Sequence, residues 1–175
     1  TDPSRTADVK PVVIGWKTFG HSGAIRLLAR SSQTDRLAHA YLITGPAKVG
    51  KTTLAVDIAC LVNSEPVVDM FGESLNIDLS TSQQADRIRR GIHSDVEIID
   101  PHTELEEDPG VSRSDEDVVA SGRQTISITH VRQMIRDSAT KPFEGTKKVF
   151  VLDGAHRMVE AAATALLKIL EEASD

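Results

Sequence analysis

Eight consecutive residues of the chain have the types and spacing of a phosphate-binding loop. Gly45-Pro-Ala-Lys-Val-Gly50-Lys51-Thr52 matches the pattern G-x-x-x-x-G-K-[ST] at every position. Glycines permit a close approach of the backbone to an anion, and the first N–H groups of the following helix point toward it. In such loops the lysine reaches the β- and γ-phosphate oxygens and the Ser/Thr hydroxyl ligates Mg²⁺. The sequence therefore predicts binding of ATP with magnesium.

The residues expected to contact the nucleotide are those of the loop and of the start of the next helix. They are Gly45, Pro46, Ala47, Lys48, Val49, Gly50, Lys51, Thr52 and Thr53. Among them, Lys48 lies within the loop, and we expect its side chain to be solvated and to have no catalytic role.

The segments on both sides of the loop have the patterns that such a loop requires. Ala40 to Thr44 (AYLIT) is a continuous apolar run that ends at a Gly-Pro pair, which is typical of a buried parallel strand. Residues 51–63 have apolar side chains at helical spacing. A strand before the loop and a helix after it are the context that supports the motif.

A second segment has the form of a magnesium-binding strand. Val149-Phe-Val-Leu-Asp153 places four apolar residues before a carboxylate. Functional residues of parallel sheets lie at the carboxyl ends of the strands, and the second strand of a phosphate-loop site holds the metal through an aspartate. We therefore expect Thr52 and Asp153 to hold Mg²⁺ through the bound ATP, although an aspartate here also suits a simple turn.

The residue after this aspartate indicates weak catalysis. Proteins of this class that hydrolyse ATP usually carry glutamate there to activate water, whereas this chain has Gly154. Glycine cannot accept a proton or orient a nucleophile. We interpret nearby Glu160 as a solvated charge on the following helix and His156 as a structural residue. We therefore predict ATP binding with weak or absent hydrolysis and assign no catalytic residue.

Strand and helix patterns alternate along the chain. Strands are expected at 40–44, 95–100 and 148–153, and helices at 21–31, 51–63, 82–93, 130–140 and 158–171. Residues 1–10 are expected to form a flexible tail, residues 11–15 are a short apolar entry segment, and residues 64–80 have no clear pattern. The alternation predicts an α/β fold with a mainly parallel sheet.

Most of the negative charge lies in one segment. Residues 101–124 contain seven acidic and two basic residues, a net charge of −5 against −6 for the whole chain. Prolines and glycines interrupt this segment, so we expect an acidic mobile loop.

Composition excludes several classes of protein. The 175 residues are 39% hydrophobic and 26% charged, which is typical of a globular protein. No apolar run is long enough to span a membrane. The single cysteine, Cys60, is expected to be buried, and one cysteine forms neither an internal disulfide nor a cysteine-based zinc site. These features favour a cytoplasmic setting. The acidic charge and six aromatic residues argue against a free-standing nucleic-acid-binding module.

Several stretches together resemble a known family. They are residues 39–55 (HAYLITGPAKVGKTTLA), 126–135, 141–145, 147–158 (KKVFVLDGAHRM) and 161–172 (AAATALLKILEE). The combination resembles the AAA+ clamp-loader subunits of bacterial DNA polymerase III, and the delta-prime type in particular, over about residues 11–175.

The resemblance implies a P-loop NTPase (AAA+) three-layer domain that is truncated at its C-terminal side. The arginine finger, the sensors, the lid and the collar domain would then lie beyond Asp175. It also implies an assembly with gamma/tau and delta subunits that loads the sliding clamp onto primed DNA. Delta-prime subunits often lack ATPase activity, which agrees with Gly154.

Two departures and two alternatives remain. Many relatives carry a four-cysteine zinc module after the first helix, which this chain lacks, and His93 and His102 have no partners at ligand spacing, so no zinc is expected. The usual proline after Leu-Glu-Glu is Ala173.

One alternative is an active gamma/tau-like motor, which Gly154 and the missing cysteines disfavour. The other is a P-loop kinase, for which the sequence shows no base or substrate pocket.

Overall fold

The computed structural model describes residues 12–68, 74–103 and 125–172. The chain divides into two compact units, Thr1–His93 and Ser94–Asp175, and each is described by itself. The predicted tail at residues 1–10 and residues 104–124 of the predicted acidic loop lie outside the described residues.

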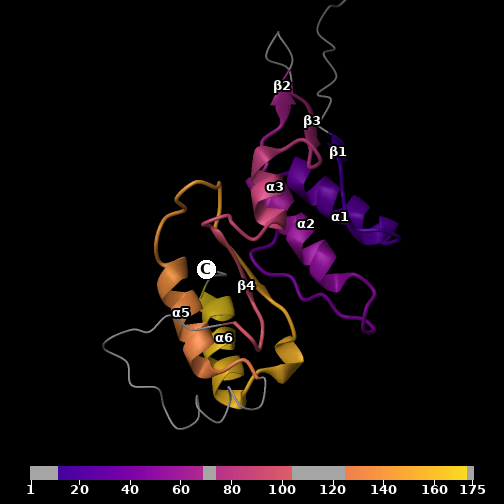
Figure 1. Cartoon of the computed structure of the whole chain (residues 1–175). Coiled ribbons are helices and arrows are strands. Elements are labelled where there is room, and N and C mark those ends of the chain that lie inside the picture. Colours follow the sequence, from indigo (N-terminus) through magenta and orange to yellow (C-terminus); the bar gives the residue numbers. More distant parts are fainter. Residues whose placement is uncertain (1–11, 69–73, 104–124, 173–175) are drawn as a thin grey trace, which may run out of the picture. The chain divides into compact units, whose positions relative to one another are not determined.

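The first unit combines a small sheet with three helices (Figure 1). Its elements are β1 (Val12–Ile14), α1 (Ser22–Gln33), α2 (Lys51–Asn63), β2 (Val67–Val68), β3 (Ser74–Asp78) and α3 (Gln83–Arg89). β3 is the central strand, with β1 parallel to it on one side and β2 antiparallel on the other. Helices α2 and α3 pack against each other, and their apolar side chains form much of the core of this unit.

The second unit is a pair of parallel strands packed against two helices. Its elements are β4 (Val96–Ile99), α5 (Ile128–Ser138), β5 (Val149–Leu152), the 3₁₀ turn η1 (Ala155–Arg157) and α6 (Glu160–Glu172). β4 and β5 pair in parallel, with Ile99 opposite Leu152. Helices α5 and α6 lie side by side (Figure 1). The core between strands and helices is built from Ile99, Ile126, Val131, Met134 and Ala162.

These elements confirm a mixed α/β structure with parallel strand pairs and correct several helix ends. Helix α2 covers the predicted residues 51–63, whereas α6 begins only at Glu160 because the turn η1 precedes it. The helix expected at residues 82–93 ends at Arg89, so Ile92 lies beyond it and is 54% exposed. Ala139 is exposed because it follows the last residue of α5.

The predicted buried strand at Ala40–Thr44 is wrong for this structure. The segment has an irregular backbone, and its Leu42 side chain is 84% exposed. A strand requires a neighbour that accepts and donates backbone hydrogen bonds. The sheet found among the described residues of the first unit contains only β1, β3 and β2. The apolar composition of this run favours burial, but it does not specify the neighbouring strand that a strand here would need.

Three short strands were not predicted as strands. β1 corresponds to the apolar entry segment, while β2 and β3 fall in the region without a clear pattern. β3 has the sequence SLNID, which alternates strictly between polar and apolar residues, so the prediction overlooked a pattern that marks a half-buried strand. Pairing with a neighbour on each side stabilises this short strand.

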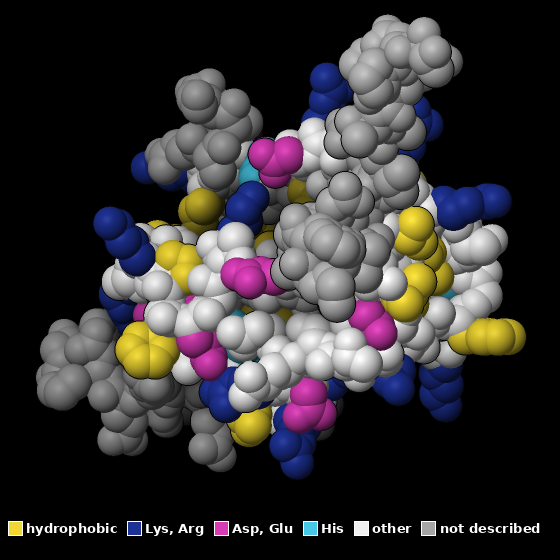
Figure 2. All heavy atoms as spheres, turned by 90° about the horizontal axis from the view of Figure 1, so that it is seen from above, with side chains coloured by type: hydrophobic (Ala, Val, Ile, Leu, Met, Phe, Trp, Pro, Cys, Tyr) yellow, Lys and Arg dark blue, Asp and Glu magenta, His cyan; other side chains and the backbone are white. Residues whose placement is uncertain are grey.

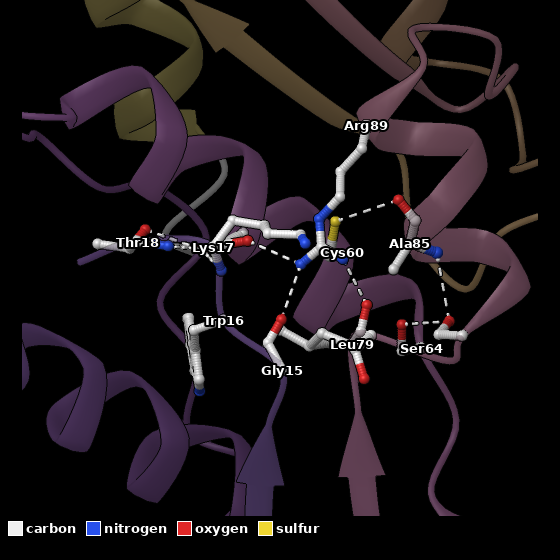
Figure 3. A network of polar contacts seen from close by, with 12 residues as sticks. Gly15, Trp16, Lys17, Thr18, Cys60, Ser64, Leu79, Ala85 and Arg89 are labelled. Atoms are coloured by element: carbon white, nitrogen blue, oxygen red, sulfur yellow. Dashed lines mark hydrogen bonds and ion pairs between the residues drawn. The ribbon is translucent and has the colours of Figure 1, made fainter.

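A network of polar contacts around Arg89 joins the elements of the first unit (Figure 3). Asp57 of α2 is 1% exposed and pairs with the guanidinium of Arg89 from α3 at 3.0 Å. It also accepts the backbone N–H groups of Lys17 and Thr18, at 2.9 and 2.7 Å, and the Thr18 hydroxyl at 2.8 Å. Arg89 donates further to the carbonyl of Gly15 at 3.0 Å. One ion pair thus joins two helices to the segment that follows β1.

A second buried carboxylate orders a loop in the other unit. Asp95, just before β4, accepts the backbone N–H groups of Phe143, Glu144 and Gly145, each at 2.7 Å. In return, the Glu144 carboxylate accepts the backbone N–H of Ser94 at 2.8 Å. These bonds fix the segment that leads into β5 against the start of β4.

Large hydrophobic side chains also lie on the surface. Phe19 and Phe143 are 96% and 87% exposed. On the face drawn in Figure 2, hydrophobic side chains are interspersed with Lys, Arg, Asp and Glu side chains. Singly exposed hydrophobic residues are normal on protein surfaces, so they identify no interface by themselves. No helix in the described part of the chain is both long and apolar enough to cross a membrane.

The buried cysteine behaves as predicted. Cys60 is 0% exposed, and its thiol lies 3.7 Å from the carbonyl oxygen of Ala85. Burial disfavours the charged thiolate and raises the pKa of Cys60 from 9.0 to about 11. Cys60 is therefore an unreactive packing residue at neutral pH.

We predict that Asp57→Ala lowers the free energy of unfolding by about 3 kcal/mol, because it leaves the Arg89 guanidinium without its counter-charge and two backbone N–H groups without their acceptor. The matched control is Asp86→Ala, which removes an exposed ion pair with Arg90 on the same unit and is expected to change stability by less than about 0.5 kcal/mol. Urea denaturation followed by circular dichroism measures both. Equal effects of the two variants would show that the buried pair is unimportant.

We also predict a pH-dependent contribution of Cys60 to stability. Below pH 9 the thiol is protonated in both the folded and unfolded states, so the benefit of burying it is fully present. Between pH 9 and about 11 the unfolded state loses this proton first, and the free energy of unfolding falls by at most about 1.4 kcal/mol per pH unit. The stability difference between the unaltered chain and Cys60→Ala should shrink across this window. A difference that stays constant from pH 8 to 11 would contradict the assignment.

Candidate functional site

The backbone of residues 45–50 forms a loop with three positive φ angles, two of them at glycines. Gly45, Lys48 and Gly50 all have positive φ angles, of 149°, 62° and 89°. Gly50 is the N-cap of α2 in the left-handed conformation. A side chain at Gly50 would meet no neighbouring atom within 4 Å, so glycine is needed there for its φ angle and not for space.

Lys51, the first residue of α2, closes this loop with its side chain. Its ammonium donates to the carbonyl oxygens of Gly45 at 3.0 Å and Pro46 at 2.5 Å. The first turn of α2 contains no acidic residue, so the positive end of the helix dipole is not neutralised from within the helix. The loop thus combines helix N–H groups, a helix dipole and a lysine charge, which together favour an anion.

The other predicted loop residues lie where a ligand can reach them. Pro46, Ala47, Lys48 and Val49 are exposed, as are Thr52 and Thr53 in the first turn of α2. Lys48 is solvent-exposed, as expected. The structure therefore brings all nine predicted nucleotide-contacting residues together around the start of one helix.

A histidine outside the motif also contacts the loop. His21, the N-cap residue of α1, places its Nε2 atom 2.7 Å from the carbonyl oxygen of Val49. Sequence reasoning missed this residue because 28 positions separate the two partners and no spacing rule connects them. A histidine directly before a helix is the only signal that the sequence offers.

Asp153 occupies the predicted place at the end of β5. Its backbone N–H donates to the carbonyl of Ile99 at 2.9 Å, which extends the parallel ladder by one residue, and its side chain is exposed. The end of β4 carries another aspartate, Asp100, which the prediction did not single out. The Asp100 carboxylate accepts the backbone N–H of His102 at 2.7 Å and therefore stabilises the turn that follows β4.

Gly154 has a conformational reason to be glycine. Its φ and ψ angles of 84° and 37° are left-handed, and it is the N-cap of η1. A side chain there would have the Pro101 and Arg157 side chains at ordinary contact distance, near 3.8 to 4.0 Å. The turn thus selects glycine at the position where a catalytic glutamate would be expected. His156 and Glu160 follow it and are exposed.

The two halves of the predicted metal site belong to different units. Thr52 lies in the first unit and Asp153 in the second. A magnesium site shared between them therefore stays a prediction. Within the described residues, no three His, Cys, Asp or Glu side chains gather in a way that could hold a metal ion by themselves.

Comparison with known proteins places the chain in a family of replication proteins. Residues 20–175 match the family described as DNA polymerase III, delta subunit, and the chain belongs to this family. The resemblance to clamp-loader subunits is thereby confirmed.

Individual relatives include two kinds of subunit. The chain is 26% identical over 168 residues to the DNA polymerase III subunit delta' of Bacillus subtilis, covering 92% of this chain and 41% of the relative. It is 27% identical over 158 residues to the subunit gamma/tau of Mycoplasma pneumoniae, covering 90% of this chain and 19% of the relative. The subunit tau/gamma of Haemophilus influenzae is 27% identical over 167 residues, with coverages of 89% and 19%. The chain thus spans less than half the length of each of these relatives, and identities of this size do not distinguish the two kinds of subunit.

Proposed function

We propose that this chain is part of the AAA+ nucleotide-binding domain of a DNA polymerase III clamp-loader subunit. It binds ATP with Mg²⁺ and helps to load the sliding clamp onto primed DNA in the bacterial cytoplasm. The observation that carries the proposal is the glycine-rich loop at the start of α2, with Lys51 folded over it, in a chain of this family.

The loop residues have separate roles in this proposal. The N–H groups at the start of α2 bind the β-phosphate. Lys51 exchanges its bonds to two loop carbonyls for bonds to phosphate oxygens, which carry full negative charge and attract the ammonium more strongly. The Thr52 hydroxyl would bind the magnesium ion that neutralises the phosphates.

Of the two kinds of clamp-loader subunit, the delta-prime type agrees better with the features of the second unit. Gly154 provides no base for water, and its left-handed turn makes the absence of a larger side chain a structural property. We therefore propose binding without appreciable hydrolysis, in a hetero-oligomer with gamma/tau and delta subunits, and only indirect contact with the clamp and DNA. The gamma/tau-like motor stays the second candidate because relatives of that kind also match. Membership of the polymerase III family disfavours a kinase.

We predict that Lys51→Ala weakens ATP binding at least about 100-fold, which corresponds to about 2.7 kcal/mol, because it removes the charged donor of the loop. Lys17→Ala is the matched control, since it removes an exposed lysine of the same unit that lies outside the loop, and it should change the affinity less than about threefold. Isothermal titration of the 175-residue chain with ATP and Mg²⁺ measures both. An unchanged affinity in the Lys51 variant would remove the basis of the proposal.

Hydrolysis by this chain alone is predicted to be negligible, below about 0.01 per second, whereas typical enzymes reach about 1 to 1,000 per second. Gly154→Glu should also leave hydrolysis negligible, because a non-glycine residue in the left-handed conformation costs about 1 kcal/mol or more and disturbs the turn that would have to hold the new carboxylate. A phosphate-release assay measures the rate. Turnover of a few per second by the unaltered chain would favour the motor candidate instead.

A further inference from the structure

His21 is held where it can orient one peptide group of the nucleotide loop. Its Nε2 atom lies 2.7 Å from the carbonyl oxygen of Val49. A carbonyl oxygen can only accept, so Nε2 must carry the hydrogen in this contact. This bond comes from outside the loop motif and ends on the residue directly before Gly50.

Fixing the Val49 carbonyl also fixes the N–H of Gly50. The two groups belong to one planar peptide, so the N–H points away from the side on which the carbonyl is bound. Gly50 has more backbone freedom than a residue with a side chain, and it holds a left-handed φ of 89°. A bond to the peptide on its N-terminal side restrains that freedom where the loop enters α2.

The segment that carries His21 is itself anchored to α2. The backbone N–H groups of Lys17 and Thr18 bind the buried carboxylate of Asp57, which lies further along the same helix. On its other side, the carbonyl of His21 accepts the N–H of Ile25 at 3.0 Å as α1 begins. The imidazole is therefore carried by backbone that is hydrogen-bonded on both sides.

These contacts form a closed circuit from α2 through Asp57, Thr18, His21 and Val49 back to the start of α2. We propose that His21 is a positioning residue that presets the loop for the phosphates of the nucleotide. The inference rests on the proposed nucleotide binding, but the anchoring itself is a property of the chain without ligand.

The anchoring is tested on the 175-residue chain without nucleotide. A long-range ¹⁵N–¹H spectrum of the histidines should show the Nε2–H tautomer for His21. The ¹⁵N order parameters of Val49, Gly50 and Lys51 should be about 0.8 or higher and should fall below about 0.6 in His21→Ala. His21→Gln keeps a side-chain N–H donor and should largely preserve the order. The control His39→Ala changes an exposed histidine before the loop and should have no effect.

The positioning role is tested by titration with ATP and Mg²⁺. His21→Ala should bind about 10-fold more weakly than the unaltered chain, with an unchanged melting temperature, whereas His21→Gln should stay within about threefold. Unchanged order parameters in His21→Ala, or equal ATP affinity of the Ala variant and the unaltered chain, would overturn the inference. If the unaltered chain bound no ATP, the proposed function would fail, and the order parameters would still decide whether His21 anchors the loop.

Discussion

The N–H groups at the start of an α-helix have no partner within that helix, and this constraint organises the candidate site. In α2 the left-handed Gly50 turns the chain so that the helix begins directly at Lys51. The lysine ammonium binds the carbonyls of the loop, and no acidic side chain in the first turn opposes the positive end of the helix. Such a helix start favours an anion with several oxygens, which is the physical basis of the proposed nucleotide site.

In each of the two units, a buried carboxylate fixes a segment of irregular backbone. Asp57 gathers backbone donors and Arg89, so that the segment after β1 lies against α2. Asp95 gathers three consecutive backbone donors and fixes the loop before β5. A buried carboxylate is tolerated only when its oxygens are satisfied by hydrogen bonds or an opposite charge, so each of them defines one arrangement of its surroundings.

The sequence predicted the parts of the fold that have strong local signals. The nine loop residues and the helix after them carry a complete motif and a helical period, and α2 has the predicted bounds. The strand before the loop failed because a strand depends on partners that its own residues do not specify. Asp57 was missed because one aspartate in a helix reads as a solvated charge until Arg89 is placed beside it. His21 was missed for the same reason, since its role depends on a contact distant in sequence.

A crystal structure of this chain with ATP and Mg²⁺ tests the central claim most directly. The account predicts the β-phosphate at about 3 Å from the first backbone N–H groups of α2. It also predicts that the Lys51 ammonium has left the carbonyls of Gly45 and Pro46 for phosphate oxygens. Nucleotide bound elsewhere, with Lys51 still on those two carbonyls, would contradict it.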